Sequence, residues 1–394
     1  MRALVSRVAR DALLGALVLL CALGGCSQAP VAKAAPGVIA SASAPRAPVS
    51  YTVETVAEGL AFPWSVAFLP DGGMLVSERN GGLRRIDAQG RLDPKTIAGT
   101  PETFAEGQGG LLEVALDPKF SENRFLYLTY AAGVARANAT RLARARYVDG
   151  RLQDLRVLFE AAPLKARDGH FGGRLAFLPD GTLLLGLGEG YFYKDAAQDL
   201  SSHLGAIVRL NRDGSVPADN PFVNQAGTRP EIYTYGHRNV QGLAVDAASG
   251  RIYAHEHGPR GGDELNLLRP GRNYGWPEIT YGIDYNGAPI SRFTEKPGME
   301  QPLLYWKPSI APSSMIFYTG AAFPAWRGDL LVSALAGQHV RRIDLADGAI
   351  AGEQELFTEL EVRIRAVAQA PDGSLVLLTD EPEGRVLRVR PKAP

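Results

Sequence analysis

Two arginines stand one residue apart near the C-terminal end of the chain. Arg363 and Arg365 flank a single isoleucine, and alternate residues of a β-strand share one face. Two guanidinium groups side by side repel each other unless an anion lies between them, and guanidinium binds carboxylates through two parallel hydrogen bonds. The pair therefore predicts a site for a ligand with several negative charges. A solvated strand edge is the alternative interpretation.

A histidine and a glutamine lie in two separate glycine-rich segments. His170 belongs to DGHFGGR, residues 168–174, directly before an apolar run, and an imidazole there could act as a general base near neutral pH. It could equally tie down a loop through hydrogen bonds. Gln108 belongs to GQGGLL, residues 107–112, where glycines let the backbone approach a ligand closely. A surface turn is the alternative for this second segment.

The segment YGHRNVQG, residues 235–242, gathers several hydrogen-bond donors. Arg238, Asn239 and Gln241 lie close together in it, and fixed donors of this kind suit a ligand rich in carboxylates or carbonyls. A loop stabilised by salt bridges is the alternative. We interpret His237, in the same segment, as a structural residue.

The segment HEHGPRGGDE, residues 255–264, carries candidate metal ligands. His255 and His257 would share one face of a strand, which would suit zinc, but the sequence offers no evident third nitrogen or thiolate ligand. Asp263 and Glu264 lie beside a Gly/Pro loop with free carbonyls. Such mixed oxygen ligands favour calcium over zinc.

A repeated phrase predicts the elements that must position these residues. An apolar stretch, Pro-Asp-Gly and a second apolar stretch recur as AFLPDGGMLVSER around Asp71, AFLPDGTLLLGLGE around Asp180 and AQAPDGSLVLLTDE around Asp372. Weaker copies are ALDPKFSENRFLYLTY, AVDAASGRIYAHEHG and AFPAWRGDLLVSAL. Each copy predicts a strand, a tight turn and a second strand, because Asp and Gly favour the turn geometry.

Six copies across residues 51–394 give roughly 57 residues per copy, enough for one blade of a β-propeller. A single sheet cannot bury both its faces, whereas neighbouring blades cover one another. We therefore predict an all-β fold, a six-bladed β-propeller of four-stranded antiparallel blades. A β-sandwich array and a β-helix are the alternatives, but β-helix repeats are shorter and no linker divides the domain into sandwiches.

Residues 1–26 predict a bacterial lipoprotein signal peptide. A basic start precedes an apolar run at residues 12–23, which is shorter than the roughly 20 residues of a membrane span. The run ends in LGGC, so Cys26 is expected to become the first mature residue and to carry acyl chains. Ser27 follows in place of an aspartate, and by resemblance to sorted lipoproteins this favours the outer membrane, facing the periplasm. A plain secretory signal or an uncleaved anchor is the alternative.

Residues 27–50, rich in Ala, Pro and Ser, predict a flexible tether, and residues 51–394 form the predicted domain. The only cysteines are Cys21 and Cys26, so the domain has no thiol nucleophile, disulfide or thiolate metal site. Lys and Arg, 42 in number, balance 42 Asp and Glu, which suggests no nucleic-acid partner.

The ordered set of segments resembles a known family. HFGGRLAFLPDG, YGHRNVQG, EHGPRGGDELN, NYGWP and SIAPSS are together similar to the soluble glucose and aldose sugar dehydrogenases that use pyrroloquinoline quinone (PQQ). The resemblance spans essentially all of residues 51–394 and is closer to the aldose sugar branch. It implies oxidation of an aldose at C1 to the lactone, with transfer of hydride to carbon C5 of PQQ.

The resemblance implies a role for each matching residue. His170 matches the general base that removes the proton of the anomeric hydroxyl. Arg238 matches the arginine that polarises the C5 carbonyl and stabilises the arriving charge. The other implied contacts to the cofactor are Gln108, Asn239, Arg363 and Arg365, the last two holding PQQ carboxylates.

The resemblance also implies calcium. Gly258 and Pro259 match backbone carbonyls that bind the calcium ion on PQQ, where the ion orients the quinone and acts as a Lewis acid. Asp263 and Glu264, with a carbonyl near Tyr274, match a second, structural calcium.

The predicted substrate contacts are Gln108, His170 and Trp306, the last forming an aromatic wall with Tyr305. Two features depart from the family pattern. The glucose enzymes have a PQQ-contacting lysine in the stretch that here reads ALAGQ, residues 334–338, and Gln198 is a candidate replacement for another cofactor contact.

Two other functions remain open from the residues. A calcium-dependent propeller lactonase or other hydrolase would hold a central metal with carboxylates from several blades, whereas here the carboxylates cluster in one segment. A non-catalytic binding propeller would keep the fold and bind no PQQ. For the dehydrogenase, the expected partners are an aldose sugar and a downstream electron acceptor, either a quinone or a cytochrome, with membrane contact through the lipid anchor alone.

Overall fold

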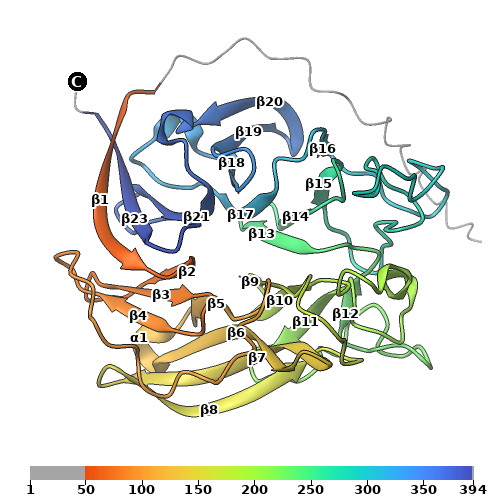
Figure 1. Ribbon diagram of the computed structural model, residues 1–394, viewed down its shortest axis with the longest axis horizontal. Coiled ribbons are helices and arrows are strands. Elements are labelled where there is room, and N and C mark those ends of the chain that lie inside the picture. The colour runs from red at the N-terminus through yellow and green to blue at the C-terminus, as the bar shows by residue number, and fades with distance from the viewer. Residues whose placement is uncertain (1–48, 393–394) are drawn as a thin grey trace, which may run out of the picture. The chain divides into compact units, whose positions relative to one another are not determined.

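Six antiparallel sheets follow one another along residues 49–392, the part of the chain that this computed structural model describes (Figure 1). Blade 1 holds β2 (Pro63–Phe68), β3 (Met74–Glu78) and β4 (Leu83–Ile86). Blade 2 holds β5 (Leu111–Leu116), β6 (Phe125–Val134), β7 (Ala137–Val148) and β8 (Arg151–Glu160). Blade 3 holds β9 (Gly172–Phe177), β10 (Thr182–Leu187), β11 (Ile207–Asn211) and β12 (Ile232–Thr234). Blade 4 holds β13 (Val240–Asp246), β14 (Arg251–Glu256), β15 (Asp263–Leu267) and β16 (Leu304–Trp306). Blade 5 holds β17 (Pro312–Phe317), β18 (Leu330–Ala334), β19 (Val340–Ala346) and β20 (Ala349–Leu356). Blade 6 holds β21 (Ile364–Gln369), β22 (Leu375–Thr379), β23 (Gly384–Pro391) and β1 (Tyr51–Leu60). The short helical turns are α1 (Phe120–Asn123), η1 (Lys194–Gln198), η2 (Pro324–Trp326) and η3 (Thr358–Leu360).

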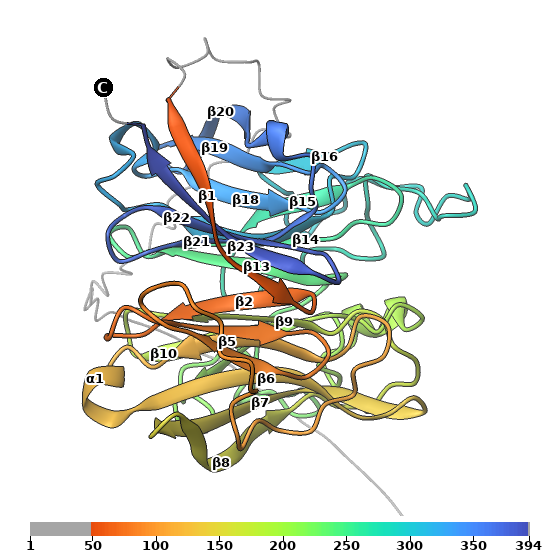
Figure 2. The same ribbon diagram turned by 60° about the vertical axis from the view of Figure 1, so that its left-hand side comes forward.

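The inner strands β2, β5, β9, β13, β17 and β21 contact one another in a closed ring and gather around the centre of Figure 1. The ring is closed by β1, which pairs with β23 of the last blade, as Figure 2 also shows. Tyr51 lies opposite Pro391 in this pairing, and Lys392 N donates to Ser50 O at 2.9 Å. The first strand of the described chain therefore joins blade 6 to blade 1.

The core lies between the blades, because side chains alternate between the two faces of each strand. On β10, Leu183 packs in one cluster with Tyr127 of blade 2, whereas Leu184 packs in another with Val240 of blade 4. Each pair of neighbouring blades shares such a cluster. Mutual burial of neighbouring sheets is the reason that a chain of short strands is stable without disulfides.

The Pro-Asp-Gly phrase forms the turn between the first two strands of a blade. The carboxylate of Asp71 accepts from the backbone N of the residue two positions on at 2.9 Å, and Asp180 and Asp372 repeat this bond at 2.9 and 3.0 Å. This short bond is what makes Asp a turn residue.

The predicted six-bladed β-propeller is confirmed, with one difference in blade 1. Five blades have four strands and blade 1 has three, with an isolated bridge between Ile86 and Leu92 where a fourth strand would pair. Pro94 follows closely and has no backbone N–H to extend the ladder.

The predicted signal peptide with Cys26, and the tether as far as residue 48, lie outside the described residues and stay predictions. Within residues 49–392, no helix is both long enough and apolar enough to cross a membrane.

Candidate active site

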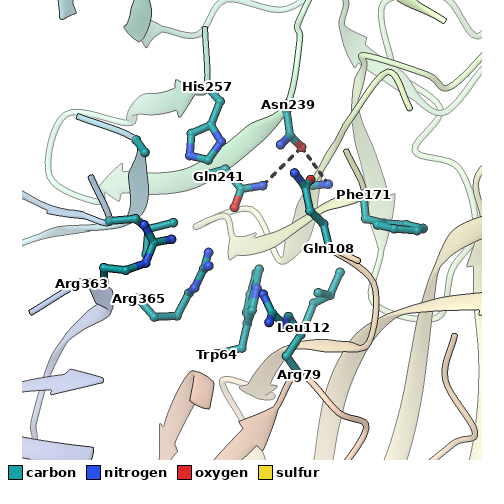
Figure 3. Close-up of a pocket in the computed structure, with 13 residues that line it drawn as sticks. Trp64, Arg79, Gln108, Leu112, Phe171, Asn239, Gln241, His257, Arg363 and Arg365 are labelled. Atoms are coloured by element: carbon teal, nitrogen blue, oxygen red, sulfur yellow. Dashed lines mark hydrogen bonds between the residues drawn. The ribbon is translucent and has the colours of Figure 1, made fainter. Parts of the chain in front are cut away.

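An inner cavity of about 230 Å³ lies at the end of the ring where the inner strands begin. All six inner strands contribute residues within one position of their first residue, and the loops before β5 and after β3, β14 and β18 supply the rest. The lining residues are Trp64, Arg79, Gln108, Leu112, Phe171, Gly172, Asn239, Gln241, His257, Ala311, Leu335, Arg363 and Arg365 (Figure 3). The propeller thus collects residues that are far apart in the sequence, as the site prediction required.

The inner cavity is electropositive. Arg79, Arg363 and Arg365 line it, and no carboxylate does so among the described residues. Asp380, behind Arg363 and Arg365, accepts from Arg363 Nε at 3.0 Å and from Arg365 Nη2 at 3.2 Å. Burial alone would raise the pKa of Asp380, but Arg365 and Arg363 outweigh burial and lower the pKa. One carboxylate against three guanidinium groups leaves net positive charge for an anionic ligand.

Gln108 and Asn239 lie across the inner cavity from Arg363 and Arg365 (Figure 3). Gln108 Oε1 accepts from the backbone N of His170 at 2.9 Å, and Asn239 Oδ1 accepts from the backbone N of Gly172 at 3.1 Å. Both side chains therefore use their oxygen to fix the segment that carries His170. No hydrogen bond between described residues engages their amide nitrogens, which remain available as donors to a ligand.

His170 forms a buried pair with Glu189, with His170 Nδ1 3.1 Å from Glu189 Oε1. A carboxylate at Nδ1 holds the proton on that nitrogen and leaves the lone pair on Nε2. Burial, together with the charges of Arg238 and Lys165, keeps the pKa of His170 well below its usual value. The imidazole is therefore neutral near pH 7 and can accept a proton.

The backbone at His170 adopts a left-handed conformation. His170 has φ +49°, a conformation that residues other than glycine adopt infrequently and that eleven other non-glycine residues of the described chain share. Lys165 contacts the segment that carries His170. Its Nζ donates to Asn138 Oδ1 at 2.9 Å and lies 3.6 Å from the centroid of the Phe171 ring.

An outer cavity of about 340 Å³ adjoins the inner one. Asn239 lines the inner cavity and Arg238 the outer, just as His257 lines the inner and Pro259 the outer. Arg238 Nη1 donates to the carbonyl oxygens of His257 and Gly258 at 3.1 and 2.6 Å. Its Nε is buried without a hydrogen-bond partner in the described chain, so the guanidinium retains a donor.

Arg174 of β9 stands at the centre of the ring and touches all five other blades. Nη1 lies 3.0 Å from Glu113 Oε2 of blade 2, and the guanidinium carbon lies 3.7 Å from the ring centroid of Trp64 in blade 1. The remaining contacts are Nε to Gln241 O at 2.9 Å in blade 4, and Nη2 to Ser313 O at 2.6 Å in blade 5 and to Arg365 O at 3.5 Å in blade 6. Trp64, Gln241 and Arg365 all line the inner cavity, so Arg174 supports its base.

The structure separates the predicted ligands of the second calcium. Asp263 and Glu264 are neighbours on β15 and therefore point to opposite faces. The Asp263 carboxylate accepts from Gly258 N at 2.9 Å, and from Ser309 Oγ, Ile310 N and Ala311 N at 2.6, 2.9 and 3.0 Å. Four donors already surround this carboxylate, so the structure does not place Asp263 in a common ligand set with Glu264.

Glu264 faces a different set of groups. It lies opposite Glu256 in the pairing of β14 with β15, and burial, followed by the charge of Glu256, raises its pKa well above the usual value. Tyr274, the third predicted residue, stacks on His237 at 4.7 Å between ring centroids. No group of three or more His, Cys, Asp or Glu side chains suited to a metal occurs within residues 49–392.

The structure does not bring Trp306 and Gln198 to the cavities. Trp306 is 5% exposed in the core between blades 4 and 5, and its Nε1 donates to Glu353 at 3.1 Å. It lies on an outer strand, so the predicted aromatic wall was assigned to the wrong residue. Gln198 instead donates to Asn273 Oδ1 at 3.1 Å and to Trp276 O at 2.7 Å. Residues 334–338 are the stretch in which the glucose enzymes have a PQQ-contacting lysine. Here Leu335 of that stretch lines the inner cavity.

Glu189, Arg79 and Trp64 belong to the site and were missed from the sequence. Each lies at a strand end beside the cavities, Trp64 on β2, Arg79 just after β3 and Glu189 just after β10. In each blade, the start of the first strand and the end of the second strand lie at the same end of the propeller. Once a propeller is assumed, charged or aromatic residues at these positions are the signal that could have identified the three residues.

Comparisons with known proteins agree on one family. The family model described as glucose/sorbosone dehydrogenase matches residues 60–388. The aldose sugar dehydrogenase YliI of Escherichia coli is 40% identical over 352 residues, which cover 88% of this chain and 94% of that protein. A crystal structure of a glucose dehydrogenase is 46% identical, with a TM-score of 0.84 over 87% of this chain and 100% of its own. The PQQ-bound aldose sugar dehydrogenase of Streptomyces coelicolor is 32% identical, with a TM-score of 0.70 over 87% of this chain and 99% of its own.

Proposed function

Because the chain belongs to the glucose/sorbosone dehydrogenase family, we propose that it oxidises aldose sugars at C1 to the lactone with PQQ as its cofactor. The observation that carries this function is the pairing of a neutral buried histidine with an adjoining cavity that three arginines line. The histidine supplies a base, and the cavity supplies a site for a polyanionic cofactor.

The residues present fit PQQ, which carries three carboxylates. Arg79, Arg363 and Arg365 offer guanidinium groups to the inner cavity, and Gln108 and Asn239, with their free amide nitrogens, lie across it from Arg363 and Arg365. The unpaired Nε of Arg238 is a further buried donor that a ligand carbonyl would satisfy. A buried donor without a partner costs free energy, so a bound carbonyl there would stabilise the complex.

When bound, PQQ supplies the two-electron acceptor that takes the hydride from C1 of the sugar. His170 takes the proton of the C1 hydroxyl at Nε2, since Nδ1 is committed to Glu189. Glu189 stabilises the imidazolium that forms. Arg238, fixed by the carbonyls of residues 257 and 258, places positive charge where negative charge develops.

We also propose that calcium binds beside Gly258 and Pro259. The support is a turn of backbone carbonyls at the outer cavity, the kind of oxygen ligand that calcium prefers. Gly258 O now accepts from Arg238, so an ion there would compete with a guanidinium group. For a second calcium, the support is the buried pair of Glu256 and Glu264, because a divalent cation would offset the repulsion between two adjacent carboxylates.

The test is reconstitution of the purified protein with PQQ and calcium, followed by reduction of a dye with glucose and other aldoses. We expect activity that needs PQQ and that a calcium chelator abolishes. Arg363→Met should weaken PQQ binding about 10- to 100-fold, because a charge-assisted contact is lost. Arg385→Met is the matched control: Arg385 is in the same blade and pairs with Glu381, outside the cavities, so PQQ affinity should not change.

Two outcomes of this experiment would contradict the proposal. Hydrolysis of lactones with calcium and without PQQ would establish a propeller hydrolase instead. Failure to bind PQQ at all would establish a non-catalytic binding propeller.

The pH dependence of the reaction is expected to report Glu189. Burial raises the pKa of Glu189 to about 7, and only its ionised form accepts the Nδ1 proton of His170 and strengthens Nε2 as a base. The value of kcat/KM should therefore rise as the pH increases through about 7, and Glu189→Gln should remove this rise. Glu231→Gln is the control, because Glu231 pairs with His203 at 3.2 Å away from the cavities. An unchanged pH profile in Glu189→Gln would contradict the role.

A further inference from the structure

A lysine lies buried beside the segment that carries the histidine base. Lys165 is 3% exposed and lines neither the inner nor the outer cavity. The hydrogen bonds of its ammonium group go to two uncharged oxygens, Asn138 Oδ1 at 2.9 Å and Arg167 O at 3.3 Å. Burial of a charged group costs free energy when no direct ion pair offsets it. A buried charge of this kind beside an active site is a candidate for a role in function.

Lys165 is anchored to β7 of blade 2. Its backbone N donates to Asn138 O at 2.9 Å, and its backbone O accepts from Asn138 N at 2.8 Å. Asn138 Nδ2 also donates to Arg167 O at 2.8 Å, so the amide and the ammonium group both bind the carbonyl that lies three residues before the base. These bonds hold the ammonium group in one position, from which its charge acts.

The side chain of Lys165 contacts the sequence neighbours of both members of the His170–Glu189 pair. Its Nζ lies 3.6 Å from the ring centroid of Phe171, the residue after His170. Its Cδ lies so close to Gly190, the residue after Glu189, that a Cβ added to the glycine would be only 2.6 Å away. The lysine therefore packs beside the backbone of both residues without entering either cavity.

The charge of Lys165 acts on both members of this pair. Burial raises the pKa of Glu189 to about 7; the charges of Arg238 and Lys165 oppose this rise, and that of Glu256 adds to it. Burial, followed by the charges of Arg238 and Lys165, keeps the pKa of His170 well below its usual value. Both effects of the lysine favour an ionised carboxylate beside a neutral imidazole, which is the form that accepts a proton.

The charge of Lys165 is itself limited to a range of pH. Burial lowers the pKa of Lys165 to about 8, although the charges of Asp168 and Glu189 favour the ammonium form. The side chain is therefore charged at pH 7 and loses its charge as the pH increases through about 8. Its electrostatic effect on the pair should end in the alkaline range.

We propose that Lys165 is a positioning residue of the base, whose buried ammonium group fixes the segment that carries His170 and offsets the negative charge of Glu189. The effect on catalysis rests on the proposed function. Because Lys165 lines neither cavity, it acts through the pair and touches neither sugar nor cofactor. The alternative is a structural lysine that holds the segment through hydrogen bonds alone.

The test compares the pH profile of kcat/KM for glucose in the PQQ-loaded wild type and in Lys165→Met. Without the charge, fewer molecules have Glu189 ionised below about pH 7. The value of kcat/KM should fall about tenfold at pH 6, which corresponds to one pKa unit. It should match the wild type at about pH 9, where Lys165 has lost its charge and Glu189 is ionised in both proteins. Lys165→Arg keeps the charge and should restore the activity at pH 6.

Lys296→Met is the matched control. The Lys296 ammonium also lies against an aromatic ring, 4.9 Å from the centroid of Phe293, but the residue lines neither cavity and contacts Glu278 instead. Its pH profile should equal that of the wild type. A loss of activity in Lys165→Met that is the same at pH 6 and at pH 9 would establish the structural alternative. An unchanged profile would also overturn the proposal.

A second measurement requires neither activity nor a substitution at Lys165, so it applies even where the methionine variant does not fold. The chain has six histidines, and the ¹⁵N-histidine NMR spectrum of the PQQ-free wild type can be followed against pH, with His170 assigned from its absence in His170→Ala. The His170 signals should shift twice, near pH 7 as Glu189 ionises and near pH 8 as Lys165 loses its proton.

This titration separates the inference from the proposed function. Absence of the step near pH 8 overturns the role of Lys165, whether or not the protein oxidises a sugar. Both steps in a protein that oxidises no sugar would support the coupling of Lys165 to the pair, while the dehydrogenase function itself would fail.

Discussion

Replacement of His170 by alanine is expected to lower kcat for aldose oxidation by about 10²- to 10⁴-fold, the usual contribution of a general base, while PQQ remains bound. The side chain is removed, but the backbone N of His170 keeps its hydrogen bond to Gln108. The inner cavity should therefore keep its shape. Steady-state dye reduction at saturating sugar gives kcat, and an absorbance titration gives the occupancy of PQQ.

The chain offers a matched control for this variant in His203, a second buried histidine beside a carboxylate. His203 Nε2 lies 3.2 Å from Glu231 Oε2, a pairing like that of His170 with Glu189. Glu189 lines the outer cavity, whereas neither His203 nor Glu231 lines either cavity. We expect His203→Ala to leave kcat per PQQ-loaded molecule unchanged. A His170→Ala protein that retains kcat within a few-fold would remove His170 from the role of base.

Replacement of Arg174 by methionine is expected to destabilise the fold by about 3–5 kcal/mol, the cost of removing one partner from a buried charge pair. Arg174 is 6% exposed, and its loss leaves Glu113 without its cation and leaves the carbonyls of Gln241 and Ser313 without their donor. The free energy of unfolding, from urea titration of the PQQ-free protein, measures the effect.

Two comparisons separate the buried pair from a general loss of charge. Arg85→Met removes a guanidinium from Asp71, a pair whose side chains are 33% and 56% exposed, and it should cost less than about 1 kcal/mol. Adding Glu113→Gln to Arg174→Met should restore part of the stability, because the unpaired carboxylate is then gone. An Arg174→Met protein as stable as Arg85→Met would show that the inter-blade contacts contribute little.

The fold was predictable because its signal is repeated and local. The Pro-Asp-Gly phrase specifies a turn through a carboxylate two residues from the N–H that it binds, and a turn needs no information from elsewhere in the chain. The three-stranded blade 1 was not predicted, because a blade size taken from six copies is an average.

The site was predictable only where residues near each other in sequence carry the signal. The inference from Arg363 and Arg365 depended on like charges two residues apart. The structure places both at one cavity, where each also pairs with Asp380. Glu189 was missed because its contact with His170 crosses from one strand to the next. Asp263 and Glu264 were grouped because they are adjacent, although adjacent residues of a strand face opposite ways.

Trp306 shows the limit of reasoning from residue type. An aromatic residue near a polar segment suggested a wall for the sugar, but position within a blade decides exposure. Trp306 belongs to the outer strand β16 and fills the core between blades. The exposed aromatics instead come from two loops, one of which follows β10, and no periodic pattern marks such loops.

The pairing of β1 with β23 also determines how the molecule can be oriented on a support. Tyr51 and Pro391 lie together at one end of blade 6, while Arg363 and Asp380 lie at the other. β23, eight residues long, spans roughly 26 Å between these ends. A surface, such as an electrode, a bead or a bilayer, that holds the protein just before Ser50 or just after Lys392 would therefore face the end of the propeller opposite the cavities. The cavities would then open toward bulk solution. Electron transfer to an electrode would need a diffusing mediator, or attachment of the protein at the end that carries the cavities.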